Sequence, residues 1–418
     1  MIKQRSVKNV LAIFVFFVLG EGLLSAQKDT SFINVLRNRD DSVSFKLTKE
    51  NNPSKINMSY GSKGWVMEFD KKFMMRVQWR LQFRFESQST TPLFFIPEED
   101  AIDGSFNVQR ARLKVGGYAY EPYYKYYLEY DFPSGYLLNW EFTFARLKYV
   151  QFKLGQWKIK YNTERFISSG KQQFVERSVS NRYFTFDRQI GIELLGDIFD
   201  GKIASSSYNL GLFNGNGRMA QNDDGKFLWF ARYQWNFSRH PMKMSYCDID
   251  RVKKVQGFIA FNYAHNRSAF TRFSSDGGGE LPGYDLGENQ QYKINQYNVE
   301  FMLKYRGLSL TTENHIKDID DTVKDFQSQI HGGYYMAGYF FSEIFKFMPK
   351  PLEVIARYAY VSNKDLFSDN INEYSIGLNW FFKGHLSKLT ADFSYVENQD
   401  FVSKEDNFRF RIQWDVSF

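Results

Sequence analysis

The chain has 418 residues, a sequence pI near 9.0, 19% aromatic residues and a mean hydropathy of −0.47. The low hydropathy excludes a bundle of apolar membrane helices, and the single cysteine, Cys247, excludes both a disulfide framework and a zinc-ribbon type of metal site. Many aromatic residues at low overall hydropathy are typical of a transmembrane β-barrel, where polar residues that face the lumen offset apolar residues that face lipid.

The first 26 residues have the parts of a secretory signal peptide. Three basic residues precede an apolar run from Val10 to Leu19, and Ser25-Ala26 supplies small residues for cleavage. A run of about ten apolar residues is shorter than the roughly 20 that a membrane-spanning helix needs, so we expect export rather than anchoring. Residues 27–63 are polar, and we expect them to form a flexible periplasmic leader.

From Gly64 onward the chain divides into amphipathic segments separated by turn residues. We expect a short strand at Gly64–Asp70, followed by longer segments whose apolar and polar residues alternate, as in strands with two different faces. Most have the roughly 9–11 residues that a tilted membrane strand requires, and their even number suits a barrel. They span residues 73–86, 107–119, 123–131, 139–148, 150–159, 188–196, 205–213, 226–236, 255–265, 291–305, 308–317, 330–342, 351–361, 371–382, 387–397 and 406–418. The sequence therefore predicts an all-β fold, a transmembrane antiparallel β-barrel of about 16 strands across residues 64–418.

The lengths of the connections support this topology independently. Connections after odd-numbered segments are mostly long, and those after even-numbered segments are mostly short, as expected for extracellular loops and periplasmic turns. The long ones are 87–106, 160–187, 214–225, 266–290 and 318–329, and the short ones are 120–122, a break near 149, 306–307 and 383–386. One connection, 237–254, is long for a periplasmic turn, and the pattern does not explain it.

Basic residues mark the lumen side of the predicted barrel. In segment 73–86 aromatic and aliphatic residues share one face, and three arginines share the other. An arginine that faces lipid costs about 2–4 kcal/mol near the midplane, so the arginine face must be the lumen. Closure of the barrel makes segment 406–418 the neighbour of segment 73–86, because unpaired strand edges are costly in hydrocarbon. The predicted basic ladder on three adjacent strands comprises Arg76, Arg80, Arg84, Arg110, Arg112, Lys114, Arg409 and Arg411.

A ladder of this type raises the local concentration of anions, and arginine binds phosphate or carboxylate oxygens bidentately. The alternative is ordinary lumen polarity, since charges of both signs occur in any water-filled barrel. Four carboxylates are also expected to point inward: Glu129, Glu193, Asp392 and Asp415. Concentration of the bases on three neighbouring strands favours a functional ladder.

Three motifs lie in and around connection 160–187, which is the third extracellular loop of the predicted barrel. They are Gly155-Gln156-Trp157-Lys158-Ile159, the segment Glu164–Ser178 with its Glu-Arg, Ser-Ser and Phe-Val-Glu-Arg-Ser elements, and Phe186-Asp187-Arg188-Gln189-Ile190-Gly191. Together they resemble the phosphate-selective porin O/P family, whose members carry a G-Q-x-K strand end, an E-R…S-S…F-x-E-R-S loop and an R-D-I-G-like strand start. Lys160 departs from the family, which usually has proline there. Over residues 64–418 the resemblance is looser and rests on the strand pattern.

The resemblance implies a homotrimer of sixteen-stranded channels in the outer membrane of a Gram-negative bacterium. It also implies that the third long loop folds into the barrel and narrows the pore, with Arg165, Lys171 and Arg177 at the constriction. The alternative for these three residues is a solvated extracellular loop. The C-terminal aromatic residue, Phe418, resembles the signal that the barrel assembly machinery reads. Phosphate itself does not carry over, because family members differ in substrate.

The five histidines are dispersed, and neither metal-ligand spacing nor the sequence context of a catalytic nucleophile is present. We therefore expect no cofactor, no metal, no enzyme activity and no nucleic-acid partner. The expected function is passive diffusion of small anionic solutes, of the phosphate or polyphosphate class, by a barrel surrounded by outer-membrane lipids. Two alternatives stay open: a barrel enzyme or adhesin that acts through its extracellular loops, and a structural interaction protein whose barrel only anchors these loops.

Overall fold

The structure is a computed structural model. It describes residues 33–37, 43–47, 56–61, 64–89, 104–222, 225–275, 277–363, 370–397 and 408–418. The expected signal peptide, residues 1–26, lies outside the described residues. Among the helices of the described part, none is long and apolar enough to cross a membrane.

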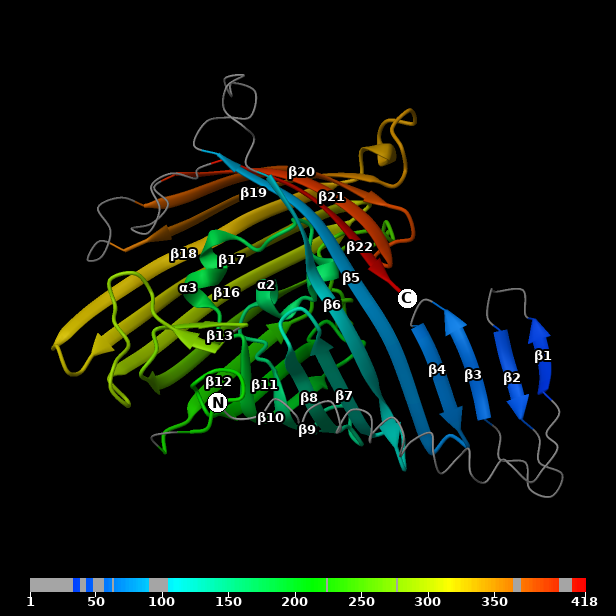
Figure 1. Ribbon diagram of the computed structural model, residues 1–418, viewed down its shortest axis with the longest axis horizontal. Coiled ribbons are helices and arrows are strands. Elements are labelled where there is room, and N and C mark those ends of the chain that lie inside the picture. The colour runs from blue at the N-terminus through cyan, green and yellow to red at the C-terminus, as the bar shows by residue number, and fades with distance from the viewer. Residues whose placement is uncertain are drawn as a thin grey trace, which may run out of the picture.

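Sixteen antiparallel strands form a closed barrel (Figure 1), as predicted, and each corresponds to one of the predicted segments. They are β5 (Phe73–Ser89), β6 (Gly104–Ala119), β7 (Tyr124–Asp131), β8 (Tyr136–Phe144), β9 (Gln151–Lys158), β10 (Arg188–Ile198), β11 (Ser206–Phe213), β12 (Leu228–Trp235), β13 (Gln256–Ser268), β16 (Tyr292–Tyr305), β17 (Leu308–Asp321), β18 (Phe326–Tyr339), β19 (Leu352–Ser362), β20 (Ile371–Phe381), β21 (Ser387–Glu397) and β22 (Phe408–Ser417). β17 and β18 extend further toward each other than predicted, so the turn between them, 322–325, is short.

The last strand closes the barrel against the first, as predicted. β22 pairs with β5 from Phe408 opposite Ser89 to Ser417 opposite Arg80. Beyond this register, the backbone N–H of Phe418 donates to the Trp79 carbonyl at 3.0 Å, and the Trp79 N–H donates back at 2.7 Å. Because β5 also pairs with β6, the three strands of the predicted ladder lie side by side.

The two faces of the wall have opposite polarity. On β5, Trp79, Leu81 and Phe83 are 36%, 40% and 48% exposed, whereas Arg80 and Arg84 are 3% exposed. This is the reverse of a water-soluble protein, because lipid surrounds the outer face while chain segments inside the barrel cover the inner one. The predicted orientation of the faces is thus confirmed on this strand.

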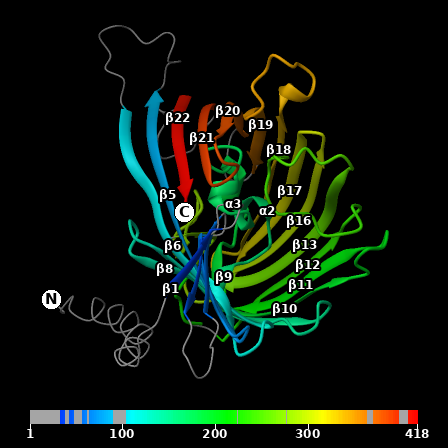
Figure 2. The ribbon, with the colours of Figure 1, turned by 90° about the vertical axis from the view of Figure 1, so that its right-hand side faces the viewer.

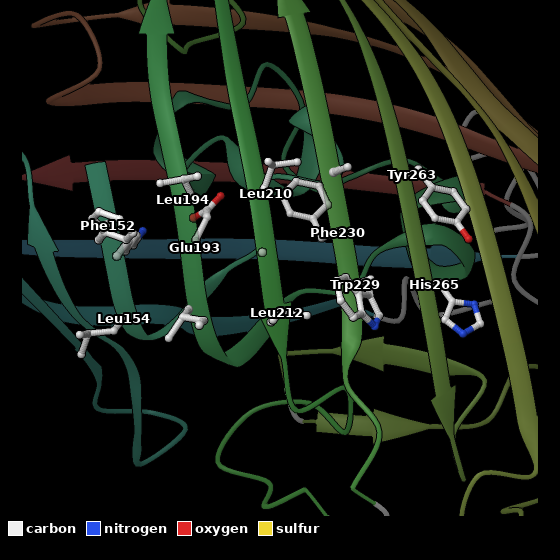
Figure 3. Close-up of a pocket in the computed structure, with 14 residues that line it drawn as sticks. Phe152, Leu154, Glu193, Leu194, Leu210, Leu212, Trp229, Phe230, Tyr263 and His265 are labelled. Atoms are coloured by element: carbon white, nitrogen blue, oxygen red, sulfur yellow. The ribbon is translucent and has the colours of Figure 1, made fainter. Parts of the chain in front are cut away.

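The outer face of β9–β13 has an apolar hollow of about 710 Å³. Figure 3 shows Leu154, Leu210 and Trp229, which border it from neighbouring strands. Glu193 also borders the hollow, but its carboxylate accepts a hydrogen bond from Asn209 at 2.8 Å. Because no set of polar groups converges on the hollow, it lacks the features of a site for a polar solute. We assign it to the lipid-facing surface.

Loop L3, residues 159–187, lies inside the ring of strands (Figures 1 and 2), where the family resemblance places it. It contains two short α-helices and one 3-10 turn: α2 (Thr163–Phe166), η3 (Ser169–Lys171) and α3 (Val179–Phe184). Two other short elements do not belong to the strands of the wall. They are the hairpin of β14 (Arg272–Ser274) and β15 (Gly277–Gly279), and the 3-10 turn η4 (Phe341–Glu343).

The long periplasmic connection between β12 and β13, residues 236–255, also contributes to the interior. Tyr246 is fully buried, and its backbone N–H donates to the carbonyl of Lys171 in L3 at 3.2 Å. Its hydroxyl lies 2.9 Å from that of Tyr334 on β18. This connection is long because it packs against L3 inside the barrel, which accounts for the exception at 237–254.

The expected flexible leader, 27–63, instead contains three strands: β1 (Ile33–Arg37), β2 (Val43–Leu47) and β3 (Ile56–Gly61). The predicted short strand is present as β4 (Gly64–Phe69). The physical reason lies in β5, whose first residues extend beyond the end of β22 and offer unpaired backbone groups. β4 pairs with them, and β3, β2 and β1 add to β4 in turn.

Candidate functional site

L3 is attached to one side of the barrel by carboxylates from five strands. They are Glu300 of β16, Glu313 of β17, Glu353 of β19, Glu373 of β20 and Asp392 of β21. Two of them hold the start of the loop. Glu300 accepts hydrogen bonds from the backbone N–H and the hydroxyl of Thr163 at 2.9 and 2.7 Å. Glu313 accepts from the backbone N–H of Glu164 at 2.6 Å.

The other three carboxylates hold the second half of the loop. Asp392 accepts from the backbone N–H of Val175, and Glu373 from that of Val179, both at 2.7 Å. Glu353 accepts from the side chain of Gln173 at 2.7 Å. A carboxylate that accepts a backbone N–H in a buried site forms a strong, charge-assisted hydrogen bond. L3 is therefore held in one position against the wall of β16–β21.

Bases of the predicted ladder hold the opposite side of L3. Arg80 donates to the Ser168 hydroxyl at 3.0 Å and to the carboxylate of Asp415 at 2.6 Å. Arg84 forms an ion pair with Glu176 at 2.5 Å. Burial would raise the pKa of Glu176, but Arg110 and Arg84 hold that pKa well below its ordinary value. These arginines thus connect L3 to β5 in addition to facing the lumen.

Other ladder bases are also paired with carboxylates. Arg112 lies 3.0 Å from Glu129 and 3.1 Å from Asp131, and Arg411 lies 2.8 Å from Asp392. A base with a carboxylate at this distance contributes less to the field in the lumen than a lone base does. The charge available to a solute is therefore smaller than a count of the ladder indicates.

Of the cavities that border L3, two are also bordered by bases of the predicted ladder. The lower chamber, of about 450 Å³, faces the periplasmic end and is bordered by Arg76, Arg80, Lys114 and Lys171. No carboxylate is among the residues that border it, and Arg76, Lys114 and Lys171 form no ion pair within the described residues. The positive charge of this chamber is therefore less compensated by carboxylates than that of the upper chamber described next.

The upper chamber, of about 300 Å³, faces the extracellular end. Its border combines four bases with two carboxylates: Arg177, Arg182, Arg409 and Arg411, with Glu176 and Glu373. The ladder thus reaches both chambers, since Arg409 and Arg411 border the upper one while Arg76, Arg80 and Lys114 border the lower one.

The three predicted constriction residues have different positions. Lys171 borders the lower chamber and Arg177 the upper chamber. Arg177 also donates to the backbone carbonyls of Glu164 and Ile167, at 2.8 and 3.2 Å, and so stabilises the fold of L3. Arg165 borders neither chamber and donates to Asp187 within the same loop, at 2.8 Å from its Nε.

Several bases that the ladder did not include lie against L3. Lys317, Arg357 and Lys388 donate to backbone carbonyls of the loop. Lys158, at the end of β9, donates to the Arg165 carbonyl at 3.2 Å, and Arg188, at the start of β10, donates to Asn139 at 2.8 Å. The alternation of β9 does not reveal Lys158, because Gly155 has a φ of +122° and interrupts the regular strand geometry. The feature of the sequence that could have identified Lys158 and Arg188 is their position at the two strand ends that flank L3.

Within the part of the chain that the structure describes, no group of three or more His, Cys, Asp and Glu residues is arranged to hold a metal ion. Charged side chains and backbone groups surround L3 on both sides. Such a site can attract, orient and pass charged solutes.

A family comparison matches residues 97–228, which include L3 and its flanking strands, to the model for phosphate-selective porin O and P. Over these residues the chain is similar to that porin family. No curated protein matches the sequence. L3, which carboxylates of five strands hold in place, lies within the matched region.

Several solved structures share the fold at low sequence identity. OmpT of Vibrio cholerae has 9% identity and a TM-score of 0.54, with 83% of this chain and 98% of that chain covered. OmpF of Salmonella typhi, in complex with daunomycin, has 10% identity and a TM-score of 0.54, covering 84% and 99%. An anion-selective porin from Comamonas acidovorans has 9% identity and a TM-score of 0.51, covering 82% and 99%.

Proposed function

We propose that this porin lets small anions of the phosphate or polyphosphate class diffuse passively past L3, without a cofactor and without a catalytic step. The observation that carries the proposal is the lower chamber. Four bases border it and no carboxylate does. Among the described residues, Arg80 is the one of the four that forms an ion pair, and Glu129 lies opposite Lys114 in the strand register. A water-filled chamber with such a wall concentrates anions and repels cations.

The upper chamber supports the same direction of selectivity. An anion that arrives from outside meets Arg409 and Arg411 first, then Arg177 on L3. Glu176 and Glu373 weaken this field, so the upper chamber attracts anions less strongly than the lower chamber does. Moderate binding at successive sites allows conduction, because a solute that binds too tightly does not leave.

We also propose that the porin is a homotrimer in outer-membrane lipid. The trimer form of Vibrio cholerae OmpT supports this assembly by its shared fold, at a TM-score of 0.53 and 10% identity. The Comamonas acidovorans neighbour is described as anion-selective, which agrees with the selectivity proposed here. Phe418, 43% exposed at the end of the closing strand, is the proposed contact for the barrel assembly machinery.

The reversal potential of single channels in a planar bilayer tests the anion preference. With a gradient of potassium chloride, the wild-type channel should show a reversal potential of the sign that chloride permeation gives. A triple variant, Arg76→Gln, Lys114→Gln and Lys171→Gln, should lose most of this preference and keep its conductance. Lys324→Gln is the matched control, because Lys324 is 56% exposed on the turn between β17 and β18. A cation-selective wild-type channel, or a triple variant with unchanged selectivity, would refute the proposal.

A further inference from the structure

The wing is the sheet of β1–β4 that extends from the periplasmic half of β5 (Figure 1). β4 pairs with β5 from Phe69 opposite Phe73 to Trp65 opposite Val77. It occupies the edge of β5 that β22 leaves free below Arg80. The wing thus continues the sheet of the barrel wall sideways, beyond the closed ring.

One face of β3 and β4 is apolar and rich in aromatic side chains. Residues directly opposite each other in an antiparallel pair project to the same face. The pairing places the following residues on one face: Ile56, Met58 and Tyr60 of β3, opposite Phe69, Met67 and Trp65 of β4. Tyr60, Trp65 and Phe69 are 38%, 50% and 38% exposed. We call this set the aromatic face of the wing.

The aromatic face is continuous with the lipid-facing surface of the barrel. Trp65 is paired with Val77, and Val77 lies on the same side of β5 as Trp79 and Leu81. The opposite face of the wing is more polar, with Asn57 and Glu68 opposite each other in the register. The wing is therefore an amphipathic sheet whose apolar side points the same way as the lipid-facing side of the wall.

The depth of the wing follows from the length of the apolar row on β5. This row runs from Phe73 to Phe85, a distance of about 40 Å, or about 30 Å along the membrane normal at a tilt of about 40°. The apolar band of an outer-membrane barrel is about 25 Å tall, or about ten residues at this tilt, so its periplasmic end lies close to Met75. β4 pairs with residues 73–77, so the wing leaves the barrel at the periplasmic boundary of the membrane.

We propose that the aromatic face of the wing rests on the periplasmic leaflet of the outer membrane, with Tyr60 and Trp65 at the headgroup level. A small sheet with one apolar face needs that face covered to be stable. Tyrosine and tryptophan favour the boundary between lipid and water. Among the described residues, the outer edge of β1 pairs with no other strand, and such an edge is costly in the hydrocarbon core. The contact broadens the footprint of the porin on the inner side of the membrane.

Site-directed spin labelling of the full chain tests this contact. In a Cys247→Ala background, single variants Tyr60→Cys, Trp65→Cys and Asn57→Cys carry the label in vesicles of phosphatidylethanolamine and phosphatidylglycerol. Collisions with oxygen, which concentrates in lipid, should exceed those with a water-soluble nickel chelate at positions 60 and 65. The opposite ratio is expected at position 57, on the other face of the same strand as position 60.

A second measurement, made without spin labels, tests the contact in case the labels disturb the wing. Quenching of tryptophan fluorescence by brominated lipid should decrease on Trp65→Phe, in protein that is otherwise unlabelled. The proposal is overturned if positions 60 and 65 are as accessible to the nickel chelate as position 57. It is also overturned if the labels at 60 and 65 show spin–spin broadening that disappears on dilution with unlabelled protein, because a second copy of the chain then covers the face.

Discussion

The ion pair between Arg80 and Asp415 determines how much of the charge in the lower chamber is visible to a solute. The two groups lie 2.6 Å apart, with side chains 4% and 2% exposed, so together they contribute almost no net charge. Arg80→Gln removes the positive charge and leaves the carboxylate in place. The wall of the lower chamber then changes by one unit toward negative, and anions should be less concentrated there.

The size of the chamber sets the magnitude. A sphere of 450 Å³ has a radius of about 5 Å, so one charge on its wall acts on a central ion with about 0.8 kcal/mol in water, or about 0.4 kcal/mol after screening by physiological salt. This energy changes the local concentration of a monovalent anion by a factor of about two to four. Breaking a buried ion pair by removing one partner also destabilises the fold, by about 3–5 kcal/mol.

The double variant Arg80→Gln with Asp415→Asn separates these effects. It removes both charges, so its chloride selectivity should return close to that of the wild type and much of the stability should be recovered. Reversal potentials in planar bilayers and denaturant unfolding in detergent measure the two quantities, with Lys324→Gln as the control outside the lumen. An unchanged reversal potential for Arg80→Gln would refute this reasoning. So would a double variant that shifts the reversal potential as far as the single one.

Three further experiments test the packing inside the barrel. Gly170→Ala should move the guanidinium of Arg80, because a Cβ at Gly170 would lie 2.1 Å from Arg80 Nη2. We expect a loss of about 1.5–3 kcal/mol in denaturant unfolding and a selectivity close to that of the wild type, because both charges of the pair remain. Asp392→Asn removes the charged acceptor of the Val175 N–H, so current noise in single-channel recordings should increase as L3 loosens; unchanged noise would contradict the tethering role. Cys247 is 2% exposed and burial raises the pKa of its thiol, so a water-soluble maleimide should label it only after unfolding; rapid labelling of the folded porin would show that residues 236–255 open.

The local alternation of apolar and polar residues was sufficient to predict the strands of the barrel wall. Lipid and the water-filled lumen make opposite demands on the two faces of each strand, so alternation in segments such as 73–86 is a direct record of both environments. Closure follows from the cost of an unpaired edge, which makes β22 the neighbour of β5. The sequence likewise indicated that Arg76, Arg80 and Arg84 face the lumen.

The sequence by itself thus determined a sixteen-stranded barrel and the side of the wall on which its bases lie. Only the tertiary structure decided which bases are neutralised, because Arg112 meets Glu129, and Arg84 meets Glu176, through strand register and loop position rather than local pattern. The same holds for residues 236–255, which pack against L3 inside the barrel, and for β4, which pairs with β5 because β22 ends at Ser417. Such contacts join segments far apart in the chain, and their partners are fixed by the stagger of the strands around the closed barrel.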